Sequence, residues 1–113
     1  MHEVGLMRDI LDHALEVARQ QGSPAIQTIR LRVGELAGVS PEELHFAFGV
    51  VTPGTVAEGS RLEVEWLPVI CHCPTCDQDF QPSDASFECP TCHETSVWIR
   101  QGRELELSAL EVT

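Results

Sequence analysis

The sequence is poor in basic residues and has no long apolar run. Seven Lys and Arg stand against eighteen Asp and Glu, which gives the 113 residues a net charge of −11 and an isoelectric point near 4.6. Nucleic acids and anionic membranes carry the same sign of charge, so this balance disfavours both as partners. The lack of any run of about 18 apolar residues excludes a transmembrane helix. Charges at Glu3, Arg8, Asp9 and Asp12 disfavour a secretion signal, so we expect a cytoplasmic protein.

The sequence also lacks the features of a disulfide framework and of a nucleophilic enzyme. Its five cysteines, an odd number, all lie between residues 71 and 92. A disulfide framework would spread an even number along the chain, so clustered thiols indicate metal ligands or redox groups. No Ser/His/Asp or Cys/His nucleophile arrangement is evident, so we do not expect an enzyme. The length predicts one compact domain with at most a small metal-stapled appendage.

Two helices are predicted in the N-terminal half. Apolar residues recur at spacings of three and four over residues 4–21, which is typical of an amphipathic helix, and Gly22 and Pro24 end it. A second helix begins after Ser40, the predicted N-cap. Glu43 closes a capping box there, and Pro41 occupies the first helical position. Pro53 and Gly54 end this second helix.

Three segments alternate apolar and polar residues with the period of a strand. The residues expected to face the core are Ile29, Leu31 and Val33, then Leu62, Val64 and Trp66, and finally Leu105, Leu107 and Ala109. Arg30 and Arg32 lie on the other face, where they can oppose glutamates of neighbouring strands at about 0.2–1 kcal/mol a pair. We therefore expect an α+β fold, a three-stranded sheet with two helices on its apolar face. The alternative is that these charges are only solvated faces.

Two Cys-x-x-Cys pairs, separated by twelve residues, lie between the second and last strands. Their thiolates, from Cys73, Cys76, Cys89 and Cys92, suit one tetrahedral Zn²⁺ in an inserted zinc ribbon. Four thiolates leave no open position, so the zinc would be structural, and metal binding would fold the lobe. A rubredoxin-like iron site has the same spacing. A thioredoxin-type redox motif needs only one such pair and fits less well.

Three residues near the pairs and three at the N-terminus have less specific patterns. Cys71, His72 and His93 are interpreted as a solvent-facing spare thiol and two surface histidines, with ligand exchange by His93 as the alternative. The Met1 amine with the amide and imidazole nitrogens of His2 forms two fused chelate rings, and Glu3 can add a fourth ligand. Such nitrogen-rich sites suit Ni(II) and Cu(II). The alternative is an ordinary exposed histidine.

Several motifs, in order along nearly the whole chain, resemble the HypA/HybF family of hydrogenase maturation proteins. They are Met1-His2-Glu3, an amphipathic first helix, Arg32-Val33-Gly34-Glu35-Leu36, Ser40 to Phe48, the two cysteine pairs and Gly102-Arg103-Glu104-Leu105. In three places this chain departs from the pattern: Asp77 and His93 stand where Gly often follows each pair, and Gly49 replaces a frequent acidic residue.

The resemblance implies a nickel metallochaperone with a nickel-binding α+β domain at residues 1–69 plus 101–113 and an inserted zinc-binding domain at residues 70–100. It implies nickel at His2, with the Met1 amine and Glu3 nearby, and structural zinc at the four paired cysteines. The implied partners are a HypB-type GTPase and the NiFe-hydrogenase large-subunit precursor, with urease maturation proteins as a further possibility and a monomer or homodimer as the state of the chain.

The acidic composition predicts how such partners are bound. We expect five exposed glutamates to dock basic patches on a partner: Glu63, Glu65, Glu104, Glu106 and Glu111. Two other functions compete with the chaperone: a zinc-ribbon interaction adaptor without nickel delivery, and a small iron or redox protein. The segment from Cys71 to Thr95 contains no Lys or Arg, which disfavours a ribbon that contacts phosphates.

Overall fold

The computed structural model describes residues 2–22, 24–83 and 86–113, and the elements divide between two compact units. The first unit contains the chain up to Arg32, Gly38–Glu65 and Glu106–Thr113; the second contains Val33–Ala37 and Trp66–Leu105. The expected first domain, residues 1–69 plus 101–113, contains three segments that lie in this second unit, namely residues 33–37, 66–69 and 101–105. The nickel- and zinc-binding roles assigned to the two ranges of the sequence remain predictions. Among the described residues, no helix has the length and apolarity needed to cross a membrane.

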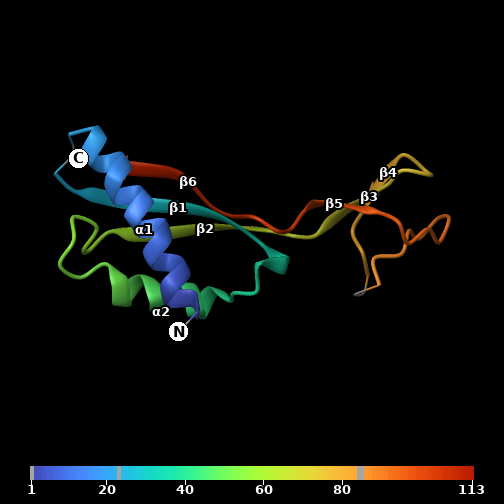
Figure 1. Cartoon of the computed structure of the whole chain (residues 1–113), viewed down its shortest axis with the longest axis horizontal. Helices are drawn as coiled ribbons and strands as arrows, with labels where there is room; N and C mark the ends of the chain where they lie inside the picture. The colour runs from blue at the N-terminus through green and yellow to red at the C-terminus, as the bar shows by residue number, and fades with distance from the viewer. Residues whose placement is uncertain (1, 23, 84–85) are drawn as a thin grey trace. The chain divides into compact units, whose positions relative to one another are not determined.

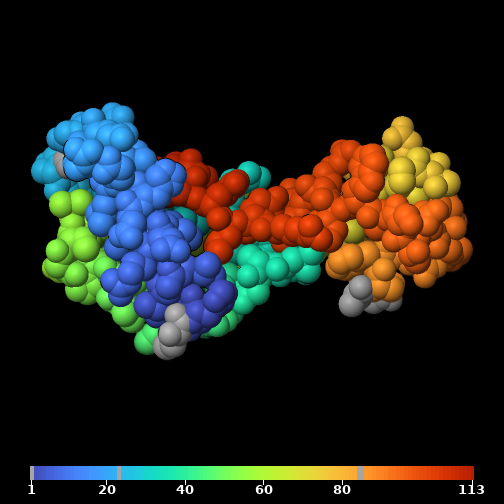
Figure 2. Space-filling model, in the orientation of Figure 1, coloured from blue at the N-terminus to red at the C-terminus, as the bar shows by residue number. Residues whose placement is uncertain are grey.

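Helix α1 (His2–Gln20) and helix α2 (Pro41–Val51) pack on each other and on the sheet of the first unit (Figure 1). The predicted stripe of α1 is confirmed, since Met7, Leu11, Ala14 and Ala18 are all buried. The outer side of α1 forms much of the face of this unit that is turned to the viewer in Figure 2. Its apolar stripe therefore faces inward while its charged side faces solvent, as amphipathic periodicity requires.

The start of α2 has the predicted capping box. The Glu43 backbone N–H donates to Ser40 Oγ at 3.1 Å, and the Ser40 N–H donates to the Glu43 carboxylate at 3.0 Å. Pro41 occupies the first helical turn, where its missing N–H has no intrahelical partner to lose. The helix buries Leu44, Ala47, Phe48 and Val51 against the core of the first unit.

The larger sheet has the strand order β2-β1-β6, with β1 (Ile26–Gly34) between β2 (Arg61–Leu67) and β6 (Leu105–Val112). Ile29, Leu31 and Val33 are fully buried, as predicted. Trp66 was expected to face the core, but it is 39% exposed, and Leu67 is buried instead. The alternation ends at the point where β2 passes from the first compact unit to the second, between Glu65 and Trp66.

Two arginines of β1 each lie between two glutamates, which confirms the predicted cross-strand pairing. Arg30 contacts Glu63 at 2.7 Å and Glu111 at 2.6 Å. Arg32 contacts Glu106 at 2.9 Å and Glu65 at 3.4 Å. All these side chains are partly exposed, so each pair contributes at most about 1 kcal/mol, and their main effect is to select neighbouring strands.

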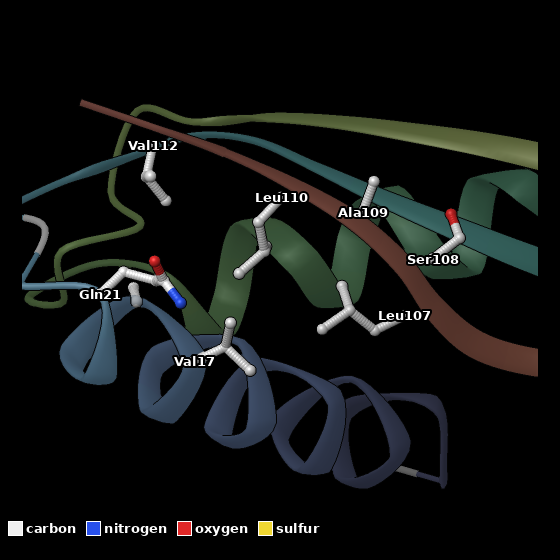
Figure 3. Close-up of a pocket in the computed structure, with 8 residues that line it drawn as sticks. Val17, Gln21, Leu107, Ser108, Ala109, Leu110 and Val112 are labelled. Carbon is white, nitrogen blue, oxygen red and sulfur yellow. The ribbon is translucent and has the colours of Figure 1, made fainter.

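Strand β6 does not keep the simple alternation that its sequence suggested. Arg30 and Arg32 are two residues apart, whereas their partners Glu111 and Glu106 are five apart, so these ion pairs do not follow a uniform cross-strand spacing. In Figure 3 the neighbours Ser108 and Ala109 both point away from α1, and the apolar side chains nearby point toward it. Ala109 was expected to face the core. Between α1 and β6 lies a hollow of about 390 Å³, lined by Val17, Ala18, Gln21, Leu107, Ser108, Ala109, Leu110 and Val112.

A second sheet, of the order β4-β3-β5, is part of the second unit. It contains β3 (Ile70–Cys73), β4 (Gln78–Phe80) and β5 (Trp98–Gln101), all antiparallel (Figure 1). In this sheet β3 is central, with His72 opposite Asp79 on one side and Trp98 on the other. The fold therefore has the predicted two helices, three-stranded sheet and separate cysteine-bearing part.

Two glycines of the second unit meet at a backbone crossing. A Cβ on Gly34 would lie 2.1 Å from the Gly102 carbonyl carbon and oxygen, and Gly102 itself has a φ of 127°. The backbone N–H groups of Gly34 and Leu36 donate to the carbonyls of Glu104 and Gly102, each at 2.7 Å. Glu35, the first residue of the 3-10 helix η1 (Glu35–Ala37), lies beside this crossing. Its carboxylate accepts from the Val69 N–H at 2.8 Å.

Candidate metal centre

Four cysteine sulfurs meet at one point of the second unit. The Sγ atoms of Cys73, Cys76, Cys89 and Cys92 all lie within 4.8 Å of one another. Cys73 Sγ lies 3.6 Å from Cys92 Sγ, and Cys76 Sγ lies 4.0 Å from Cys89 Sγ. Ligands about 2.3 Å from a tetrahedral Zn²⁺ are about 3.8 Å apart, whereas a disulfide needs about 2.05 Å. The sulfurs are thus spaced for a zinc ion rather than for disulfides.

The two cysteine pairs come from different kinds of structure. Cys73 ends β3 and Cys76 lies in the turn that leads to β4. Cys89 and Cys92 lie in an irregular segment between β4 and β5, closed by a hydrogen bond from the His93 N–H to the Cys89 carbonyl at 2.9 Å. Cys73 and Cys89 are buried, Cys76 is half-buried and Cys92 is exposed. One edge of the cluster therefore reaches solvent.

The electrostatics of the cluster favour binding of a cation. Backbone N–H groups of Cys92 and Thr91 donate to the Cys89 sulfur and lower the pKa of that thiol to about 6. In contrast, the neighbouring thiols, that of Cys92 first, raise the pKa of Cys76 to about 12. Four crowded sulfurs cannot all ionise without a counter-charge. A divalent ion supplies it, so zinc binding and thiol deprotonation are coupled.

The residue after each pair has a left-handed backbone conformation. Asp77 has a φ of 53° and His93 a φ of 64°. Glycine adopts this conformation without a steric penalty, while other residues incur about 1–2 kcal/mol. This geometry explains why Gly suits both positions, and it shows that the chain forms both turns with non-glycine residues.

The interpretation of the residues beside the pairs was wrong for two of three. Cys71 and His72 were expected to face solvent, but Cys71 is fully buried and His72 is 8% exposed. Both lie on β3, the central strand of its sheet, and the Trp98 ring stacks on the His72 imidazole. Burial raises the pKa of the Cys71 thiol. His93 is exposed, as expected, and its ring contacts the Glu88 carboxylate. The sequence of these four residues alone does not indicate that they form the central strand of a sheet.

The predicted nickel residues lie at the start of α1 in the first unit. His2 is the first residue of that helix and is exposed, Glu3 is half-buried, and Met1 lies outside the described residues. Backbone N–H groups in the first turn of a helix have no intrahelical acceptor, so the His2 amide is not committed to a helix hydrogen bond. Within the described part of the chain, neither side chain joins a cluster of three or more potential metal ligands.

The acidic surface is smaller than the sequence suggested. Of the five glutamates, Glu63 and Glu104 are half-buried, and the Glu104 carboxylate accepts from the Gly102 N–H at 2.8 Å. The Glu104 carboxylate therefore stabilises the backbone crossing and is not part of an open acidic surface. The other four surround Arg30 and Arg32, so this face of the sheet has more negative than positive groups.

Comparisons with known proteins agree with this arrangement. The family described as "Hydrogenase/urease nickel incorporation, metallochaperone, hypA" matches residues 1–112. The chain is 43% identical over 112 residues to Hydrogenase maturation factor HypA of Picosynechococcus sp., covering 99% of both chains. It is 38% identical to the protein of the same name from Chloroflexus aggregans, covering 98% of both.

Solved structures show the same fold. "Solution structure of HypA protein" matches with a TM-score of 0.77 at 24% identity, covering 100% of this chain and 97% of that one. "Solution structure of the Ni metallochaperone HypA from Helicobacter pylori" matches with a TM-score of 0.69 at 22% identity, covering 97% and 96%. With the whole-chain sequence matches and the four-cysteine zinc site, these findings show that the chain belongs to the HypA family of hydrogenase maturation nickel metallochaperones.

Proposed function

We propose that the chain binds Ni(II) at its N-terminus and delivers it to the large-subunit precursor of a NiFe hydrogenase, without catalysing a reaction itself. In this proposal His2 is the principal nickel ligand, with the Met1 amine and Glu3 as co-ligands. The observation that carries it is His2 at the exposed first position of α1, in a chain matched from residue 1 by a nickel metallochaperone family.

The nitrogen donors suit a cargo that must leave again. The amine, the His2 amide and the imidazole form chelate rings that favour Ni(II), and the exposed helix start keeps the remaining positions open to a recipient's ligands. A buried, fully enclosed site would instead slow release. The N-terminal donors therefore combine selectivity for nickel with exchange.

Structural zinc at Cys73, Cys76, Cys89 and Cys92 is the second part of the proposal. Zinc supplies the charge that holds the four thiolates together. Its support is the mutual distance of the sulfurs and the backbone N–H groups that point at Cys89. Because the four sulfurs complete a tetrahedron, no position is left for a substrate, which supports a structural rather than a catalytic ion.

The partners belong to the same proposal. A HypB-type GTPase would work with this chain in the cytoplasm, and the family description names urease beside hydrogenase, so urease maturation proteins are further candidates. The four glutamates around Arg30 and Arg32 would dock basic patches on these proteins. Neither nucleic acid nor a membrane is a partner in this proposal.

A nickel titration of protein with its native first residue tests the function. Calorimetry is done on the unaltered chain, on His2→Ala and on His13→Ala, a matched control that removes another exposed histidine from α1. We expect about one nickel per chain in the unaltered protein and in His13→Ala, none in His2→Ala, and about one zinc in all three. Nickel binding that survives His2→Ala refutes the N-terminal site and favours the zinc-ribbon adaptor. Iron in place of zinc favours the redox alternative.

A further inference from the structure

His72 lies at the centre of a polar network beside the first cysteine pair. Its Nδ1 donates to Asp79 Oδ1 at 2.7 Å, and its Nε2 lies 3.3 Å from Asp77 Oδ1. The Trp98 ring stacks on the imidazole at a centroid distance of 5.4 Å. Arg100 completes the network with a 3.1 Å contact from Nη1 to Asp79 Oδ2. A buried histidine thus has both ring nitrogens facing carboxylates and one ring face covered.

These contacts span the turn that holds the first two sulfurs. Cys73 follows His72 directly, and Cys76 precedes Asp77 directly. The hairpin register places His72 opposite Asp79 and Cys73 opposite Gln78. The imidazole therefore links β3, which precedes the turn, to Asp77 and Asp79, which follow it. A slip of either strand would break these contacts and change the spacing of the two sulfurs at the same time.

Among the residues that the structure describes, the second cysteine pair has no equivalent polar network. Cys89 and Cys92 lie in an irregular segment, and the histidine beside them, His93, is exposed, with its ring against the Glu88 carboxylate. Cys92 is itself exposed. The two halves of the cluster therefore differ: the first is fixed within a three-stranded sheet, whereas the second is held by local turns.

We propose that His72 is the positioning residue of the metal centre, which keeps the Cys73–Cys76 turn in its zinc-binding shape through Asp79, Asp77 and Trp98. This inference rests on the proposed zinc ligands and concerns a residue that does not touch the metal. Residues that orient metal ligands change metal affinity by about 10- to 100-fold when they are replaced. The first pair then serves as the preformed half of the site, onto which the second pair closes.

Two substitutions of His72 separate packing from hydrogen bonding. His72→Phe keeps an aromatic ring against Trp98 but cannot donate to Asp79. His72→Asn is smaller but retains an N–H donor near the position of Nδ1. His45→Phe, which alters an exposed histidine of α2 in the other unit, is the matched control. Asp79→Ala removes the acceptor instead of the donor and serves as a second route if His72→Phe does not fold.

Zinc transfer to a chromogenic chelator and the absorption bands of cobalt-substituted protein are the readouts. Far-ultraviolet circular dichroism checks that the helices remain. We expect His72→Phe and Asp79→Ala to lose zinc about 10-fold faster or more, with altered cobalt–thiolate bands. His72→Asn should restore most of the difference, and His45→Phe should match the unaltered chain.

The proposal is overturned if folded His72→Phe or Asp79→Ala releases zinc at the rate of the unaltered chain with the same cobalt bands. It is also overturned if His72→Asn behaves like His72→Phe, because the retained donor then has no effect. A lack of zinc in the unaltered protein would overturn the ligand assignment itself. That failure is distinguishable, because it is measured before any His72 variant is compared.

Discussion

Gly34→Ala should strongly destabilise the protein because of the backbone crossing in the second unit. An added Cβ would lie 2.1 Å from the Gly102 carbonyl carbon and oxygen and 2.6 Å from the Arg103 nitrogen. These are backbone atoms, so no side-chain rotation relieves the overlap, and the two segments must separate. The separation breaks the hydrogen bonds from the Gly34 and Leu36 N–H groups, each of 2.7 Å.

The cost follows from these contacts. Two lost backbone hydrogen bonds are worth about 2 kcal/mol together. Overpacking a close contact adds about 1–3 kcal/mol. The sum is about 3–5 kcal/mol, a large part of the 5–15 kcal/mol or so that stabilises a typical domain. We therefore expect a large fall in the urea midpoint of Gly34→Ala.

Urea unfolding of zinc-loaded protein, followed by circular dichroism, measures this effect. Gly5→Ala and Gly49→Ala are matched controls, since both glycines lie within helices and an added Cβ there meets nothing within 4 Å. Alanine has a higher helix propensity than glycine, so the free energy of unfolding of these control variants should rise by up to about 1 kcal/mol. A Gly34→Ala midpoint within error of the unaltered protein would show that the crossing is not rigid and refute the reasoning.

Two further predictions concern the left-handed turns and the charged face. In urea unfolding of the zinc-loaded variants, the free energy of unfolding of His93→Gly should exceed that of His93→Ala by about 1 kcal/mol. Both variants lack the imidazole, but only glycine adopts a φ of 64° without strain, so equal stabilities would contradict this. The affinity for a HypB-type GTPase should fall steeply as the salt concentration rises from low to several hundred millimolar. This salt dependence should be weaker in the double variant Glu65→Gln/Glu106→Gln, whereas salt-independent binding would rule out electrostatic docking.

Local patterns predicted most of the helices and the metal cluster because their causes are local. The Ser40–Glu43 capping box involves residues three apart, and both of its hydrogen bonds are present. The stripe of α1 depends only on helical periodicity. The four sulfurs could be grouped because a single ion needs four ligands and two Cys-x-x-Cys pairs supply them.

The features that the sequence did not reveal depend on contacts between distant segments. Cys71 and His72 are both buried on the central strand of the second sheet, and alternation along four residues cannot indicate burial on both faces. The break in the alternation of β6 is seen in the structure, where the neighbours Ser108 and Ala109 point to the same side of the strand (Figure 3). Gly34 belongs to a motif used for the family resemblance, but its steric reason lies at Gly102, far along the chain.

The donor sets explain why two metals would use separate parts of one small chain. Four thiolates, two of them buried, hold a tetrahedral zinc ion with slow exchange, which suits an ion that maintains structure. A nickel cargo must instead pass to a recipient, and this requires open coordination positions and accessible ligands. In the proposed function, the exposed start of α1 provides the open positions and the accessible ligands. Its donors are nitrogen atoms, whereas the zinc site uses only thiolates. Replacing His2 should therefore leave zinc content unchanged, and replacing His72 should leave nickel binding unchanged.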